Sequence, residues 1–258
     1  ISLFLAGIGP GIFLISLFII FSIIYSKFFG GYKPVPAASW EDRKKHSIKV
    51  LPTIMLAVLI LGGIYTGVFT PTEAAAVGFS LALFLTTILL RSLTFDDFKK
   101  ALFESMVTTA AILVIIAGAK IFGKAIALYR IPQDISMFIE ATIQSKAIFM
   151  ITVCLILVAM GLVFETLSMV LIMVPVLLPA AMSMGVDPIW FGIFMVIMVE
   201  CALITPPVGL NLYVIQSVAK TQLGEVAKGV IPFLIMMIFT VFIMYIWPDL
   251  ALYIPFKL

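Results

Sequence analysis

Long apolar runs, separated by short polar stretches, dominate the order of residues along this chain. A helix needs about 20 apolar residues to cross a bilayer. Runs that approach or exceed this length predict membrane-spanning helices at residues 1–26, 50–70, 74–90, 106–129 and 229–247. Because lipid offers no partner to backbone polar groups, the spanning segments are expected to be helical. The pattern predicts an all-α polytopic membrane protein.

The polar stretches between these runs predict several shorter features. Residues 30–49 are rich in charge and are expected to form a polar loop. Residues 93–103 set apolar positions against charged ones, a pattern typical of a helix that lies in the membrane interface. Residues 132–143 predict a short helix. Thr70 or Thr72 is expected to cap the start of the third spanning helix.

The run at residues 147–186 is too long for a single crossing. Glu165 is its only charged residue. The chain must turn back within the run, and Gly161 marks the expected position of that turn. Two full crossings and a re-entrant hairpin both fit this pattern.

The run at residues 188–219 is interrupted in its middle by Thr205–Asn211. Pro206 and Pro207 remove two backbone donors and push the residues before them out of the α-helical region. Gly209 allows backbone conformations that other residues avoid. Unpaired backbone groups at membrane depth are tolerated only where protein or a wet cavity covers them. A polar ligand is therefore expected at this break.

Composition supports the membrane assignment and narrows the chemistry. Hydrophobic residues make up 63% of the chain, charged residues make up 11%, and the mean hydropathy is +1.26. The net charge of +3 is too small to indicate nucleic-acid binding. His46, the only histidine, lies in a charged stretch, which argues against His-rich zinc sites and Ser–His catalysis. Cys154 and Cys201 are interpreted as core residues. The sequence predicts neither an enzyme nor a bound cofactor.

The turn at residues 161–168 and the break at residues 204–211 share a glycine, hydroxyl side chains and an interruption of the helix. Two interrupted elements in succession indicate a transporter binding site. Carbonyl and hydroxyl oxygens there can replace the water shell of Na⁺, and the N-terminus of a half-helix suits a carboxylate. The candidate site residues are Gly161, Glu165, Thr166, Ser168, Thr205, Pro206, Pro207, Gly209 and Asn211, of which Gly161, Thr166, Thr205 and Gly209 are the Na⁺ candidates.

Other interpretations stay open at this point. A passive channel lined by the broken helices is the main alternative, and its flux would not depend on a sodium gradient. Glu165 also fits a turn residue that faces water. Glu200 is an ionisable residue within an apolar run, where charge is costly. It could couple to an ion or pair with Lys120 or Lys124.

Four motifs resemble those of the large membrane subunit of TRAP (tripartite ATP-independent periplasmic) transporters, in the ion-transporter superfamily. They are Gly62–Gly78, the Gly161–Thr166 turn, Gly185–Pro188 and Thr205–Leu212. The resemblance covers essentially the whole chain. Glu165 is one departure, since aspartate is expected to be commoner there.

The resemblance implies a fold of two inverted repeats, each with a hairpin and a broken helix, in which a transport domain moves like an elevator against a fixed scaffold. This chain begins without methionine and is expected to be the C-terminal half, with the other wall of the site in the missing half. The implied parts are 1–104 (scaffold helices and an interfacial arm helix), 105–220 (half of the transport domain, with a hairpin at 145–184 and a broken helix at 188–219) and 221–258 (a terminal spanning helix).

The function that the resemblance implies is sodium-coupled uptake of an organic acid, such as sialic acid or a C4-dicarboxylate, across the bacterial inner membrane. Na⁺ would be the coupling ion, without a further cofactor. The implied partners are a small TRAP membrane subunit, a periplasmic substrate-binding protein, the organic acid and the lipid bilayer.

Overall fold

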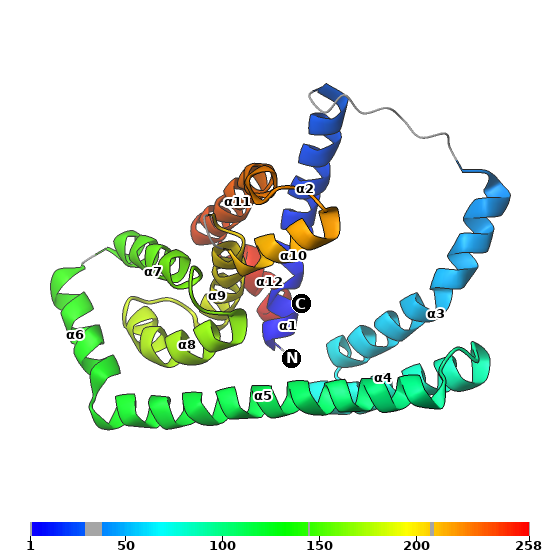
Figure 1. The fold of residues 1–258 in the computed structure, drawn as a ribbon. Helices are drawn as coiled ribbons and strands as arrows, with labels where there is room; N and C mark the ends of the chain where they lie inside the picture. Colours follow the sequence, from blue (N-terminus) through cyan, green and yellow to red (C-terminus); the bar gives the residue numbers. More distant parts are fainter. Residues whose placement is uncertain (1, 29–37, 144, 207–208, 258) are drawn as a thin grey trace. The chain divides into compact units, whose positions relative to one another are not determined.

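A computed structural model describes residues 2–28, 38–143, 145–206 and 209–257. All regular elements in these ranges are helical, which confirms the expected all-α class (Figure 1). Six helical segments in these described ranges are long and apolar enough to cross a membrane. The helices are α1 (Ser2–Ala6), α2 (Ile8–Phe28), α3 (Trp40–Tyr65), α4 (Pro71–Phe84), η1 (Leu85–Leu89, π-helical), α5 (Phe95–Leu128), α6 (Ile131–Thr142), α7 (Lys146–Met160), α8 (Thr166–Ser183), α9 (Pro188–Leu203), α10 (Leu210–Ala219), α11 (Leu223–Ile246) and α12 (Asp249–Lys257).

The chain divides into two compact units, and the first consists mainly of residues 24–111. Within it α3 packs against α4. Thr70 caps α4 in a reciprocal capping box: its hydroxyl accepts the Glu73 N–H at 3.3 Å, while the Glu73 carboxylate accepts the Thr70 N–H at 2.8 Å. Of the two predicted caps, Thr70 is therefore the one used.

Two predicted boundaries near this unit are wrong. The polar loop was expected to extend to residue 49, but α3 begins at Trp40, because the Ser39 hydroxyl accepts the Asp42 N–H at 3.1 Å and acidic residues occupy the first turn. Residues 29–37 lie outside the described part of the chain. The amphipathic piece at 93–103 is continuous with the following span, forming the single 34-residue helix α5.

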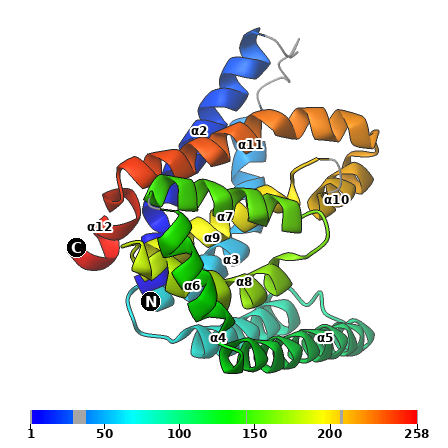
Figure 2. The same ribbon diagram turned by 90° about the vertical axis from the view of Figure 1, so that its left-hand side faces the viewer.

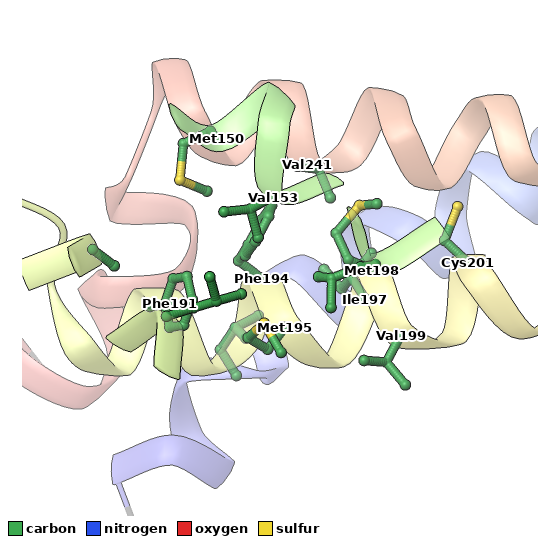
Figure 3. Packing of buried hydrophobic residues seen from close by; sticks show 14 of the residues in the cluster. Met150, Val153, Phe191, Phe194, Met195, Ile197, Met198, Val199, Cys201 and Val241 are labelled. Carbon is green, nitrogen blue, oxygen red and sulfur yellow. The ribbon is translucent and has the colours of Figure 1, made fainter. Parts of the chain in front are cut away.

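The second unit contains residues 6–23 and 112–258, and α9 is its central helix. Helices α7, α8, α10, α11 and α12 all pack against α9. A helix that is apolar on nearly every side is suited to such a core position. Figure 3 shows side chains of α7 and α11 converging on α9, including Met150 and Val153 from α7 and Val241 from α11.

The C-terminal helix α12 was not predicted, since the last span was expected to end the regular structure at residues 247–249. In the structure, the C-terminal end of α11 is hydrogen-bonded to the core. Pro248 has no N–H to give to the Met244 carbonyl, and the buried Trp190 indole N–H donates to that carbonyl instead, at 3.1 Å. The bond fixes the end of α11 against the start of α9. At the other end of the chain, Gly9 lies against the Leu250 carbonyl of α12, where even a methyl group would overlap.

Candidate functional site

The predicted turn at residue 161 separates two antiparallel apolar helices, α7 and α8, which lie beside α9 (Figure 2). Gly161 ends α7 and donates its N–H to the Leu157 carbonyl at 2.9 Å. The N–H groups of Val163 and Phe164 both donate to the Met160 carbonyl at 2.9 Å. These bonds satisfy the backbone of the turn, so the hairpin reverses direction over very few residues.

Glu165 starts the returning helix of the hairpin. One carboxylate oxygen accepts the Leu167 N–H at 2.9 Å, and the other accepts the Ser168 N–H at 2.7 Å and the Ser168 hydroxyl at 2.6 Å. The negative charge lies at the positive end of α8, which stabilises the helix. Both oxygens are thus engaged in capping. This arrangement fits the interpretation of Glu165 as a turn residue.

We expect Glu165→Ala to destabilise the hairpin by about 0.5–2 kcal/mol, because three hydrogen-bond donors at the start of α8 lose their acceptor. Glu165→Ser keeps a capping oxygen without the charge and should recover most of this loss. Thermal unfolding of the purified protein measures both. If Glu165 acts only as a cap, adding Na⁺ should change the unfolding temperatures of the wild type and of Glu165→Ser by the same amount. A sodium-dependent rise in the wild type that is absent from Glu165→Ser would instead assign a bound Na⁺ to Glu165.

The broken helix ends its first half at Leu203 and resumes at Leu210. Thr205 donates its hydroxyl proton to the Cys201 carbonyl at 2.7 Å and its N–H to the Ala202 carbonyl at 3.2 Å. The Leu203 carbonyl would normally accept the N–H of residue 207, but that residue is proline. The predicted break is therefore confirmed. Pro207 itself lies outside the residues that the structure describes.

Backbone oxygens gather beside Gly209. The φ of Gly209 is +37°, and a methyl group added to it would lie 2.9 Å from the Leu203 oxygen and 3.0 Å from the Thr205 oxygen. Among the described residues, no N–H donates to either oxygen. A side chain at residue 209 would occupy the space beside these two oxygens. The absence of a side chain at Gly209 thus lets its backbone lie close to both carbonyl groups.

The hairpin turn and the helix break meet directly. Gly161 is buried, and a methyl group added to it would lie 2.4 Å from the Ala202 Cβ and 2.8 Å from the Ala202 oxygen. Ala202 belongs to the last turn of α9, immediately before the break. The two interrupted elements that the sequence singled out are thus brought together at Gly161 and Ala202. We call Gly161, Ala202 and the adjoining residues 203–205 the junction.

The other predicted site residues lie near the hairpin turn or the helix break. Thr166 is the first residue of α8 and is half-buried, and its hydroxyl makes no hydrogen bond within the described part of the chain. Ser168 lies in the same first turn and lines a cavity of about 280 Å³ with residues of α5. Pro206 and Asn211 are half-buried on the two sides of the break. The structure gives no contact that joins Ser168 or Asn211 to the junction.

Two groups at this site, Ala202 and the Leu203 carbonyl, were not predicted from the sequence. Ala202 could not be singled out, because a small apolar residue in an apolar run carries no signal of its own. The Leu203 carbonyl could have been found from Pro207, which cannot donate to it. The described residues contain no group of three His, Cys, Asp or Glu side chains arranged for a metal. The oxygens of the junction itself are neutral carbonyls and the Thr205 hydroxyl, a set that suits the replacement of a monovalent cation's water shell better than the binding of a transition metal.

Comparisons with known proteins show the family of the chain. Residues 1–250 match the family described as "Tripartite ATP-independent periplasmic transporter, DctM component". The sialic acid TRAP transporter large permease protein SiaM of Vibrio cholerae is 32% identical over 98% of this chain and 59% of its own length. The C4-dicarboxylate TRAP transporter large permease proteins DctM of Pseudomonas aeruginosa and Rhodobacter capsulatus are 36% and 37% identical, over 98% of this chain and 59% and 58% of their lengths.

These relatives are transport permeases rather than enzymes. The chain spans about three-fifths of the length of the relatives that it matches. The family match extends from the first spanning helix to α12 and includes both the hairpin turn and the helix break. The chain belongs to the DctM component family of tripartite ATP-independent periplasmic transporters.

Proposed function

We propose that this chain forms part of the large permease of a sodium-coupled transporter that takes up an organic acid across the bacterial inner membrane. The junction carries the proposal. It combines the end of one half-helix, a hairpin turn, a threonine hydroxyl and two carbonyl oxygens without a donor among the described residues. In secondary transporters, unwound carbonyls and half-helix ends bind the coupling cation near the middle of the membrane.

The helix lengths support a re-entrant hairpin. Helix α7 has 15 residues and α8 has 18. At about 1.5 Å per residue, α7 extends roughly 22 Å, less than the ~30 Å hydrocarbon core, while α8 extends roughly 27 Å and is one of the six described segments long enough to cross a membrane. Because α7 is too short for a full crossing, we propose that the hairpin ends inside the membrane. The two halves of the broken helix, with 16 and 10 residues, are also short. Both interruptions are thus proposed to lie at membrane depth, where they form one cation site.

The substrate is proposed to be a small carboxylic acid. The N-terminus of α10 presents backbone N–H groups and a positive helix dipole on the far side of the break, which suits a carboxylate. The named substrates of two relatives, sialic acid and C4-dicarboxylates, are carboxylic acids. The partners that we propose are a small membrane subunit and a periplasmic substrate-binding protein, in keeping with the tripartite family. The elevator-like movement and the three parts 1–104, 105–220 and 221–258 belong to the same proposal.

Reconstitution of the complete transporter tests this function. Liposomes containing the permease and its small subunit would receive binding protein loaded with radiolabelled sialic acid or a radiolabelled C4-dicarboxylate. We expect accumulation above equilibrium only when Na⁺ is higher outside, and none when K⁺ replaces it. Accumulation that persists without a sodium gradient would refute the coupling. A passive channel would equilibrate the acid but never concentrate it.

A further inference from the structure

Within the second unit, one stripe of the central helix α9 is left uncovered. Its residues Gly192, Val196 and Glu200 are spaced four apart and therefore share one face of the helix. Val196 is 52% exposed and Glu200 is also exposed, while most other residues of α9 are buried. A helix that is packed on its other sides thus has one open face, and that face carries a carboxylate. We call it the Glu200 face.

The position of Glu200 makes contact with lipid unfavourable. Helix α9 begins at Pro188, so Glu200 lies about 18 Å along the helix axis at ~1.5 Å per residue. This distance is close to the middle of a ~30 Å hydrocarbon core. Ionisable residues at such depth almost always face the interior of a bundle and have a partner. In the described part of the chain, Glu200 has neither a hydrogen bond nor an ion pair, and neither Lys120 nor Lys124 reaches it.

The Glu200 face is separate from the junction. Ala202, which contacts Gly161, is two residues further along α9. With 3.6 residues per turn, the two side chains point in directions about 200° apart. Glu200 therefore does not point toward the hairpin turn, and the proposed ion site does not account for it.

We propose that the Glu200 face is covered by a membrane helix of the same large permease, from the part that lies outside the region matched here, and that this helix carries a lysine or arginine opposite Glu200. The large permease relatives extend about two-fifths of their length beyond the match, so such a helix has a source. A basic side chain complements the carboxylate, and Gly192 on the same stripe allows a second helix to approach closely. The inference does not depend on sodium coupling.

Substitutions at residue 200 in the complete transporter test this pairing. If the face is covered by a basic helix, Glu200→Leu leaves an unpaired cation, and we expect a lower unfolding temperature and at least a tenfold loss of uptake. Glu200→Asp should stay within threefold of the wild type. Glu104→Leu, which removes an exposed carboxylate from the first turns of α5, serves as the control and should have little effect. An unchanged or higher unfolding temperature with normal uptake in Glu200→Leu would overturn the proposal, because leucine suits lipid.

A charge exchange identifies the partner. In a Glu200→Lys background, each intramembrane lysine or arginine of the permease outside these 258 residues would be changed to glutamate. We expect one such change to restore at least a tenth of wild-type uptake. Rescue from the small subunit instead, or from no residue at all, would overturn the proposal.

Accessibility gives a second measurement if the charge variants fail to fold. The wild-type transporter would be reconstituted with a lipid whose acyl chain carries a photoactivated diazirine, which inserts into C–H bonds without needing a thiolate. We expect no lipid label on Val196 by mass spectrometry, and labelling of Val196 in the native transporter would contradict a covered face.

Discussion

Gly161→Ala is expected to lower sodium-driven uptake about 30-fold. The added methyl group would lie 2.4 Å from the Ala202 Cβ and 2.7 Å and 2.8 Å from the Ala202 carbonyl carbon and oxygen. Two of these atoms belong to the backbone and cannot rotate away. Overpacking of a tight contact typically costs 1–3 kcal/mol of free energy. If this cost falls on the conformation that carries out transport, about 2 kcal/mol lowers the uptake rate about 30-fold. Initial uptake rates in proteoliposomes measure this effect, and thermal unfolding shows how much of it is lost stability.

Two further variants sharpen this test. Gly11→Ala adds a methyl group where no atom lies within 4 Å, so uptake should remain normal. Ala202→Gly removes the Cβ that clashes, and the double variant Gly161→Ala with Ala202→Gly should recover part of the activity. Recovery would demonstrate coupling between the two residues. Equal uptake in Gly161→Ala and Gly11→Ala would show that the hairpin turn and the helix break need not touch.

The second large effect is expected for Gly209→Ala, which should raise the sodium concentration for half-maximal uptake at least tenfold. The positive φ of +37° disfavours an L-residue, at a cost of roughly 1–2 kcal/mol. The methyl group would also lie 2.9 Å and 3.0 Å from the Leu203 and Thr205 oxygens. It would push away the carbonyl groups that we propose as ligands.

Gly185→Ala separates backbone strain from loss of ligands. Gly185 also has a positive φ, of +72°, but no atom lies within 4 Å of an added methyl group. This variant should lose comparable stability and keep normal sodium dependence. Sodium titrations of uptake for both variants provide the comparison. The same half-maximal sodium concentration in Gly209→Ala and Gly185→Ala would exclude a role for the two carbonyl oxygens.

Features that depend on local chemistry could be predicted from the sequence. Adjacent prolines cannot continue a helix, so the break in the run at residues 188–219 followed directly from Pro206 and Pro207. The turn at Gly161 followed from the length of the apolar run. The early start of α3 was missed because its charged first turns resembled a loop, although Ser39 with the acidic residues after it forms a recognisable helix start.

Features that depend on tertiary packing could not be predicted. Nothing in the sequence pairs Gly161 with Ala202, since the contact exists only once α7 and α8 have packed on α9. Helix α12 was missed because its stability depends on the core, where the Trp190 indole bonds the end of α11. Glu165 was predicted either to bind an ion or to be a turn residue that faces water, and its capping of α8 was not predicted, because the start of α8 at Thr166 could not be placed from the apolar run alone.

The most direct test of the proposed coupling site is the sodium dependence of uptake in Thr205→Ala, compared with Thr205→Ser and Thr152→Ala. Thr152 makes the same type of hydroxyl bond, to the Ile148 carbonyl at 2.9 Å, but lies in α7 away from the turn. If the Thr205 hydroxyl binds the coupling ion, Thr205→Ala raises the half-maximal sodium concentration at least tenfold, while Thr205→Ser and Thr152→Ala stay close to the wild type. Normal sodium dependence in Thr205→Ala would contradict a sodium site at the junction.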